Sequence, residues 1–329
     1  MTDTILSVKD LCVSFDTEIG LLNVLDHVSF KLRKGKTLGL VGESGCGKSV
    51  TSMSIMRLLP QPAGRITKGE IKYNDMDIIK LDGPLLREIR GNRIAMIFQE
   101  PMTALNPVQT IGKQILEVYK LHRQELNKKQ SLDACIELLE RVGIPEPSIR
   151  LSEYPHQLSG GMRQRIVIAM ALACKPDILI ADEPTTALDV TIQAQILDLM
   201  KSLQEEMGMG ILFITHDLGV IAELCDDIVV MYAGRVVEKT SVVELFSNPK
   251  HPYSKGLLNS IPRINSVKTK RLPTIDGQVP SLAEMPKGCR FQNRCPHAEP
   301  SCEDQSHQLS QVSNGHHVNC HKWDVINHA

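Results

Sequence analysis

The stretch that decides the fold of this chain reads Gly42-Glu43-Ser44-Gly45-Cys46-Gly47-Lys48-Ser49. It fits the pattern G-x-x-x-x-G-K-S, in which glycines let the backbone curl so that its N–H groups point at phosphate oxygens. The apolar run 37–41 before it is typical of a buried strand, and the helix-compatible segment after it stops at Pro60 and Pro62. The sequence therefore predicts a nucleoside triphosphate site built from a strand, a loop and a helix N-terminus.

Two side chains of this loop have chemical roles in such a site. Lys48 would reach the β- and γ-phosphates, and the Ser49 hydroxyl would bind Mg²⁺. The other positions expected to contact the nucleotide are Gly42, Ser44, Gly45, Cys46 and Gly47. Lys48 and a helix N-terminus both favour the thiolate of Cys46, so this residue is either a reactive thiol or a small buried one.

Composition limits the classes of function. The chain has 329 residues and a net charge of −1, so bulk charge gives no indication of a nucleic-acid partner. The sequence has no N-terminal signal segment and no apolar run of the roughly 20 residues that span a bilayer. We expect a cytoplasmic protein whose membrane role depends on partners, and nine cysteines that are thiols or metal ligands rather than disulfides.

Apolar runs separated by helical segments predict an α/β fold with a mostly parallel sheet covered on both faces. Besides 37–41, strands are expected at residues 5–8, 11–15, 24–32, 94–98, 178–183, 211–215, 228–232 and 235–238. A helical subdomain, at about residues 100–176, would be inserted between strands. In its clearest helix, 131–142, one apolar face is formed by Leu132, Ile136, Leu139 and Val142.

Polar side chains stand at the ends of three predicted strands. Asp182 would hold Mg²⁺, and Glu183 would be the general base that polarises the attacking water. Gln99 is expected to contact Mg²⁺ or the water, and His216 to bind the γ-phosphate and orient the water. These four residues are the candidate hydrolytic machinery.

A second glycine-bearing helix start, Ser159-Gly160-Gly161, predicts a second anion site. Two such helix starts in one chain are explained if the nucleotide is sandwiched between two subunits. Segment 159–161 would then reach the nucleotide bound by a partner.

These motifs, in this order, resemble an ABC-transporter ATPase: G-E-S-G-C-G-K-S, the Gln99 loop, L-S-G-G-M, I-L-I-A-D-E, A-L-D at 187–189, and His216. The resemblance covers about residues 5–245. It implies an ABC-type core with antiparallel N-terminal strands, and one ATP site that combines Lys48 and Ser49 with the four strand-end residues. It also implies that Phe15, which residue type alone would place in the core, stacks on the adenine.

The C-terminal part is similar to the dipeptide and oligopeptide importer ATPases. The similarity rests on His251-Pro252-Tyr253, a proline-rich linker, clustered cysteines, and the motifs at 99–107 and 155–165. It implies an ATPase at the cytoplasmic side of the inner membrane that powers peptide import. Its partners would be a second ABC ATPase in a heterodimer, two transmembrane permeases and an extracytoplasmic peptide-binding protein.

Other functions remain open at this point. Within the class, related importers carry nickel, glutathione or antimicrobial peptides. A soluble ABC ATPase that acts on DNA or ribosomes is disfavoured by the single cassette and by the lack of a long heptad run. A redox or metal sensor is the third alternative.

The domain organisation follows from composition. A cassette is expected at residues 1–260, and a linker with a small cysteine-rich domain at 261–329. A tail of about 40 residues buries too little apolar surface to fold without a covalent or metal cross-link. Its four cysteines, Cys289, Cys295, Cys302 and Cys320, have the spacing C-x5-C-x6-C-x17-C. Tight C-x2–4-C pairs, which are usual for structural zinc, are absent, and four thiolates suit an iron–sulfur cluster. The similarity to the peptide-importer ATPases implies a [4Fe–4S] cluster here, with zinc, free thiols or disulfides as alternatives.

Histidines offer further ligands in this tail, namely His297, His316, His317 and His321. Because the tail lies far in sequence from the phosphate loop, we expect its metal to be structural or regulatory. Loss of a cysteine should then leave nucleotide binding largely intact.

Overall fold

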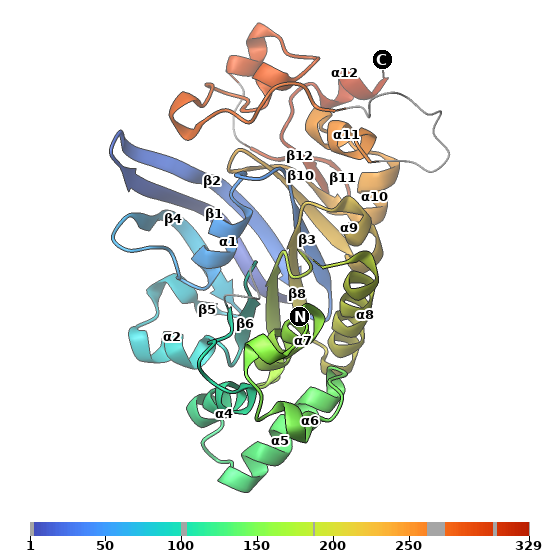
Figure 1. Ribbon diagram of the computed structural model, residues 1–329. Coiled ribbons are helices and arrows are strands. Elements are labelled where there is room, and N and C mark those ends of the chain that lie inside the picture. The colour runs from blue at the N-terminus through green and yellow to red at the C-terminus, as the bar shows by residue number, and fades with distance from the viewer. Residues whose placement is uncertain (1–2, 100–103, 187, 262–273, 305–307, 329) are drawn as a thin grey trace. The chain divides into compact units, whose positions relative to one another are not determined.

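The structure is a computed structural model that describes residues 3–99, 104–186, 188–261, 274–304 and 308–328 (Figure 1). These residues form two compact units, each assembled from separate parts of the sequence. The first unit contains residues 1–5, 33–36 and 80–213, and the second contains 6–32, 37–79 and 214–329. Part of the expected linker (262–273), residues 100–103 of the Gln99 loop and Ala187 lie outside the described residues.

In the second unit, the N-terminal strands form a four-stranded sheet in the order β2-β1-β4-β5, and β1 pairs with β4 in antiparallel fashion as the resemblance implied. The sequence predicted two strands separated by Lys9 and Asp10, whereas the structure has one continuous strand with a bulge there. A bulge absorbs the extra residue without ending the strand, and Asp10 has a φ of 49°. The bounds are β1 (Thr4–Thr17), β2 (Gly20–Arg33), β4 (Gly64–Tyr73) and β5 (Met76–Asp77).

The second unit also holds five strands in the order β11-β12-β10-β9-β3. Strand β3 is parallel to β9, whereas β10 is antiparallel to β9, and β12 is antiparallel to β10. Because β12 belongs to the tail, the tail is joined to the sheet by strand pairing. The bounds are β3 (Thr37–Val41), β9 (Asp227–Tyr232), β10 (Arg235–Ser241), β11 (Ser310–Ser313) and β12 (His316–Val318).

The helices of the second unit include the one that follows the phosphate loop. Their bounds are α1 (Lys48–Ile55), α9 (Leu218–Leu224), α10 (Val242–Ser247), α11 (Pro252–Asn259) and α12 (Trp323–His328). Helix α1 ends before the predicted stop at Pro60. The largest fully buried side chains of this unit include Phe30, Tyr232 and Tyr253.

In the first unit, β6 and β7 are parallel, and β8 lies next to β7. Their bounds are β6 (Ile94–Ile97), β7 (Ile178–Asp182) and β8 (Gly210–Thr215), the last two residues of β8 belonging to the second unit. Helix α2 (Gly83–Ile89) precedes β6, and α8 (Val190–Met207) connects β7 to β8. Both β7 and β8 are buried along their whole length, as expected for strands covered on both faces.

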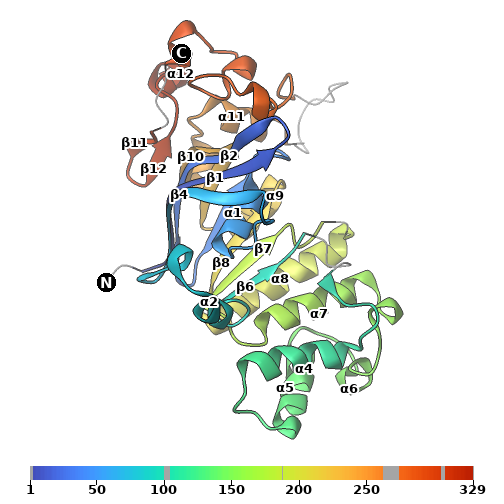
Figure 2. The same ribbon diagram turned by 90° about the vertical axis from the view of Figure 1, so that its left-hand side faces the viewer.

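The predicted helical subdomain is present between β6 and β7, and Figure 2 shows α4, α5 and α6 gathered together. The bounds are α4 (Ile111–His122), α5 (Lys128–Arg141), α6 (Pro147–Arg150) and α7 (Gly160–Leu172). Short 3-10 helices occur at Ile78–Lys80, Pro155–Gln157, Leu282–Glu284, Gln292–Arg294 and Pro300–Glu303. In the part of the chain that the structure describes, no helix is long and apolar enough to cross a bilayer.

The predicted face of α5 is partly wrong. Leu139 and Val142 are buried, but Leu132 is 43% exposed and its place in the core is taken by Cys135 and Leu138. The reason is tertiary, because α5 packs against α4, α6 and α7, so its buried stripe is set by three neighbours.

Candidate nucleotide site and cysteine cavity

The phosphate loop, residues 42–49, takes its shape from glycines. Gly42 has a φ of 153°, and a Cβ there would lie 2.2 Å from the carbonyl oxygen of Met231. Gly47 has a φ of 99°, and a Cβ there would lie 2.6 Å from the Leu25 side chain. Any other residue would be strained and would clash at either position. Ser44 and Gly45 are exposed at the tip of the loop, where a ligand can reach them.

Lys48 is the first residue of α1 and only 7% exposed. Its Nζ donates to the carbonyl oxygens of Gly42 at 2.7 Å and Glu43 at 3.2 Å. The ammonium group therefore lies within the curl of the loop. Ser49 follows it at the helix N-terminus, half-buried. The strand, loop and helix follow one another as the sequence motif predicted.

Cys46 is fully buried in the same loop. Burial raises the pKa of its thiol above the ordinary value, although the charge of Lys48 opposes the shift. The expectation of a reactive thiolate is therefore wrong, and the alternative of a small buried thiol is correct. The desolvation of the anion outweighs the nearby positive charge because no solvent reaches the sulfur.

In the first unit, strand pairing brings Gln99 and Glu183 together. Ile97 is in register with Ala181, so the residues two positions further along each strand are also close. Gln99 Nε2 donates to Glu183 Oε2 at 3.2 Å, and the hydroxyl of Thr186 donates to the same oxygen at 3.1 Å.

The backbone at the two adjacent acids has a feature that the sequence did not reveal. Asp182 ends β7 and is 3% exposed, whereas Glu183 is half-buried with a φ of 47°. A non-glycine residue in the left-handed region is strained, and such strain concentrates at functional sites.

The second glycine-bearing helix start is built as predicted. Ser159 caps α7, and its Oγ accepts from a backbone N–H three residues on at 3.3 Å. Ser159 and Gly160 are exposed and Gly161 is half-buried, so this helix N-terminus is open to a ligand. The buried side chain of Gln164 donates to the carbonyl oxygen of Pro184, which ties α7 to the segment after Glu183.

Phe15 and His216 belong to the second unit. Phe15 lies in β1 opposite Gly64, where a Cβ would lie 2.9 Å from the phenylalanine ring. The ring is half-buried rather than part of the fully buried core, so one part of it remains accessible. His216 directly follows β8 and is exposed, and Asp217 after it caps α9.

The four tail cysteines line one small enclosed cavity, together with His297 and others. The backbone N–H of Cys289 donates to the carbonyl oxygen of Cys302 at 2.8 Å. All nine cysteines lie among the described residues, and no disulfide joins any two of them. Burial raises the pKa of Cys320 to about 11, so a metal that binds there has to displace a proton.

The tail histidines have different surroundings. His316 is fully buried, and its Nε2 lies 2.7 Å from Glu238 Oε1. Burial alone would raise the pKa of Glu238, but the bonds from His316 and from two backbone N–H groups lower it. His316 is thus committed to a buried polar network. His321 Nε2 lies 3.0 Å from the Ser301 hydroxyl, whereas His297 lines the cysteine cavity.

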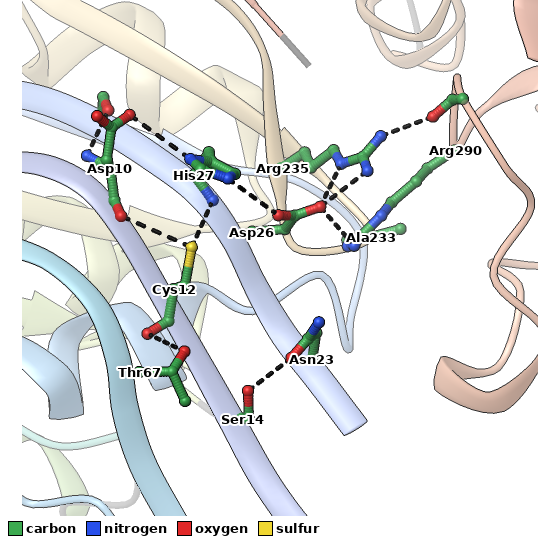
Figure 3. A network of polar contacts seen from close by, with 12 residues as sticks. Asp10, Cys12, Ser14, Asn23, Asp26, His27, Thr67, Ala233, Arg235 and Arg290 are labelled. Atoms are coloured by element: carbon green, nitrogen blue, oxygen red, sulfur yellow. Dashed lines mark hydrogen bonds and ion pairs between the residues drawn. The ribbon is translucent and has the colours of Figure 1, made fainter. Parts of the chain in front are cut away.

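A polar network that sequence reasoning missed lies on β1 and β2 (Figure 3). Cys12, Asp26 and His27 each place one ligand atom within 4.8 Å of the others. However, Asp26 Oδ2 accepts from Arg235 Nε and Arg290 Nη2, both at 2.8 Å. Two guanidinium groups neutralise this carboxylate and would repel a cation, so the cluster is unsuited to a metal.

The described residues contain both a phosphate loop and a second capped, glycine-bearing helix start. The chain belongs to the ATP-binding proteins of ABC transporters: residues 25–186 match the ABC transporter family. Residues 237–302 match a second family, described as the oligopeptide/dipeptide transporter C-terminal region.

Two relatives and two solved structures illustrate the similarity. The dipeptide transport ATP-binding protein DppD of Bacillus subtilis is 50% identical over 97% of this chain and 94% of its own length. The oligopeptide transport ATP-binding protein OppD of the same organism is 50% identical over 95% of this chain and 87% of its own length.

Among solved structures, a dimeric post-hydrolysis ATP-binding cassette with bound ADP and phosphate has a TM-score of 0.64 and 28% identity, over 72% of this chain and 98% of that one. The cbiO1 subunit of the cbiONQ transporter complex from Clostridium perfringens has a TM-score of 0.63 and 26% identity, over 75% of this chain and 92% of that one. The predicted ABC-type α/β core, with its antiparallel N-terminal strands, is therefore confirmed. The protein is an ATPase that binds ATP with Mg²⁺ and couples hydrolysis to transport.

Proposed function

We propose that this chain powers the import of dipeptides or oligopeptides. The observation that carries the proposal is the match of residues 237–302 to a region described for peptide transporters, outside the part that matches ABC transporters in general. Similarity to DppD and OppD over nearly the whole chain supports it further. Import of nickel, glutathione or antimicrobial peptides by a related transporter is the alternative.

Reconstitution tests this proposal. The chain would be assembled in proteoliposomes with its second ATPase, its permeases and its binding protein. ATP hydrolysis and uptake should rise when the binding protein is supplied with dipeptides or short oligopeptides. Stimulation by nickel or glutathione, with none by any peptide, would refute peptide import while leaving the ATPase assignment standing.

We infer the following roles in the ATP site. Lys48 binds the β- and γ-phosphates, Ser49 and Asp182 hold Mg²⁺, and Glu183 activates the attacking water. The position of Lys48 inside the loop supports the first role, and the strained backbone of Glu183 supports the last.

The remaining three residues would act on the attacking water, on Mg²⁺ and on the adenine ring of ATP. The bond from Gln99 to Glu183 supports a function of Gln99 beside the water and Mg²⁺. His216 would orient the water at the γ-phosphate. The half-exposed ring of Phe15 would stack on adenine.

We propose that the partner of this chain is a second, related ATPase. In that heterodimer, Ser159, Gly160 and Gly161 would bind the γ-phosphate of the ATP held by the other subunit. The exposed N-terminus of α7 supports this role, because buried donors could not reach a ligand on another chain.

The helical subdomain is our candidate for the permease-binding surface. An apolar cavity of about 770 Å³ lies among α4, α5 and α6 and is lined by Leu116, Leu121, Leu132 and Ile136. Leu121 is 62% exposed, as expected of a side chain that a partner covers. A peripheral position at the cytoplasmic side of the membrane, together with a peptide-binding protein on the far side, completes the proposed assembly.

We propose that the cysteine-rich region at residues 261–329 holds a [4Fe–4S] cluster on Cys289, Cys295, Cys302 and Cys320. Their convergence on one cavity supports a shared metal. Four cysteine thiolates are the usual ligand set of such a cluster.

A further inference from the structure

Glu43, the second residue of the phosphate loop, is held by side chains of the C-terminal region. Its backbone N–H donates to Tyr253 Oη at 2.9 Å. Its two carboxylate oxygens accept from Arg294 Nη1 at 2.6 Å and Nη2 at 3.0 Å. Its carbonyl oxygen accepts from Lys48 Nζ at 3.2 Å. Glu43 therefore links Lys48 to two side chains that are 210 and 251 positions away from Glu43 in the sequence.

Arg294 is fixed from every side. Nε donates to the carbonyl oxygen of Asp276 at 2.9 Å, and Nη2 donates to that of Ile275 at 3.2 Å. Nη1 also contacts Tyr232 Oη at 3.5 Å. With the two bonds to Glu43, these contacts use all five N–H donors of a side chain that is 3% exposed. The single ammonium group of a lysine cannot reproduce this planar set.

Tyr253 is equally fixed. It is fully buried, and its ring packs edge-on against Tyr232 at 4.8 Å between centroids and in a tilted arrangement against Phe291 at 5.4 Å. It sits in the first turn of α11, which His251 caps with its side chain. The hydroxyl that accepts from Glu43 is therefore held at a constant position relative to the helix.

A second arginine close to Arg294 in sequence, Arg290, acts on the other end of the phosphate loop. Arg290 donates to the carboxylate of Asp26 at 2.8 Å and to the carbonyl oxygen of Ala233 (Figure 3). The next residue, Gly234, donates its N–H to the carbonyl oxygen of Cys46 at 2.9 Å. Arg290 thus stabilises the turn on which the end of the phosphate loop rests.

We propose that Tyr253 and Arg294 are positioning residues for ATP. They hold Glu43, and through it Lys48, in the conformation that receives the phosphates. Arg294 lies in segment 289–295, between the first two tail cysteines, so the ordering of this segment sets the affinity of the loop for nucleotide. The distance in sequence between the tail and the phosphate loop predicts that changes in the tail leave nucleotide binding largely intact. The contacts of Arg294 argue against that prediction. The inference rests on the assignment of residues 42–49 as the ATP site.

The test compares binding of Mg-ATP by the full chain, assembled with its partner subunits, in gentle variants. Arg294→Lys keeps the positive charge but loses the planar guanidinium group, and Tyr253→Phe removes only the hydroxyl group. We expect Arg294→Lys to bind about tenfold more weakly, with a raised KM for ATP, an unchanged kcat at saturating ATP and an unfolding midpoint near that of the wild type. Arg93→Lys is the control, because Arg93 pairs with Asp177 in the first unit, outside both the ATP site and the helical subdomain.

A double-mutant cycle locates the effect. If Arg294 acts through Glu43, adding Arg294→Lys to Glu43→Gln should weaken binding much less than it does in the wild type. Wild-type affinity in both Arg294→Lys and Tyr253→Phe, or an equal loss with and without Glu43→Gln, would overturn the inference. Lys48→Ala separates the two assignments: if it also binds Mg-ATP normally, the ATP site itself is misassigned.

Discussion

Acid should destabilise this protein through the buried His251. His251 is 1% exposed and caps α11, where its Nδ1 accepts the N–H of Tyr253 at 3.1 Å. An accepting Nδ1 carries no proton, so the folded state needs the neutral ring. Burial lowers the pKa of His251 from 6.5 to about 4, although the nearby Glu238 opposes the shift.

The sign and size of the effect follow from this difference. Above pH 6.5 the His251 ring is neutral in both the folded and the unfolded state, so this ring contributes no pH dependence to the stability. Between pH 6.5 and about 4, the unfolded chain binds a proton that the folded chain does not, so the free energy of unfolding falls as the pH falls. The loss should be about 2 kcal/mol at about pH 5 and about 3 kcal/mol in full.

Equilibrium urea unfolding at about pH 7 and about pH 5 measures this loss. The His251→Asn variant keeps a capping side chain but cannot titrate, so its stability should fall by about 2 kcal/mol less than that of the wild type between the two pH values. His321→Asn, which removes an exposed histidine, serves as the control and should behave like the wild type. If His251→Asn and the wild type lose the same stability, the buried neutral ring is not the cause.

Further predictions concern turnover, assembly and metal. Glu183→Gln should bind ATP but not hydrolyse it, so that an ATP-bound dimer accumulates in size-exclusion chromatography; hydrolysis near the wild-type rate would contradict the assignment of the base. The isolated chain should hydrolyse ATP slowly and accelerate on addition of its partner ATPase and permeases, and Ser159→Ala should reduce this gain; full activity of the chain alone would argue against a shared site. Anaerobically purified protein should be brown with about four iron atoms per chain, and Cys302→Ser should lose both; stoichiometric zinc or no metal would refute the cluster.

Much of the nucleotide site could be predicted from sequence because its determinants are local. The phosphate loop needs glycines at fixed spacing, and Gly42 and Gly47 do have backbone angles or contacts that other residues cannot accept. The meeting of Gln99 with Glu183 could also be expected, because both residues follow buried strands and parallel strands end at the same edge. Apolar runs therefore indicated most strands, but they missed the bulge that keeps β1 continuous and the four strands β4, β5, β11 and β12.

Properties that depend on burial could not be read in this way. The sequence places Cys46 beside Lys48 and leaves both a reactive and a small buried thiol open, but burial in the folded chain raises the pKa of this thiol. His316 seemed to be one of several tail histidines, whereas strand pairing buries it against Glu238. Desolvation is a property of the whole packed environment, and the residues that cause it are scattered along the chain.

By itself, the sequence determined the class of this protein, the order of its motifs and the residue types that act on ATP. Only the tertiary structure showed which residues that are far apart in the sequence come into contact. Arg294 and Glu43 are 251 positions apart and carry no shared motif, yet their opposite charges meet in a bidentate pair. The physical reason is that a salt bridge needs only proximity and a matching geometry, and proximity between distant residues is set by strand order and helix packing. For the same reason, four cysteines with irregular spacing reach one cavity, because the folded backbone, and not their spacing, brings the sulfurs together.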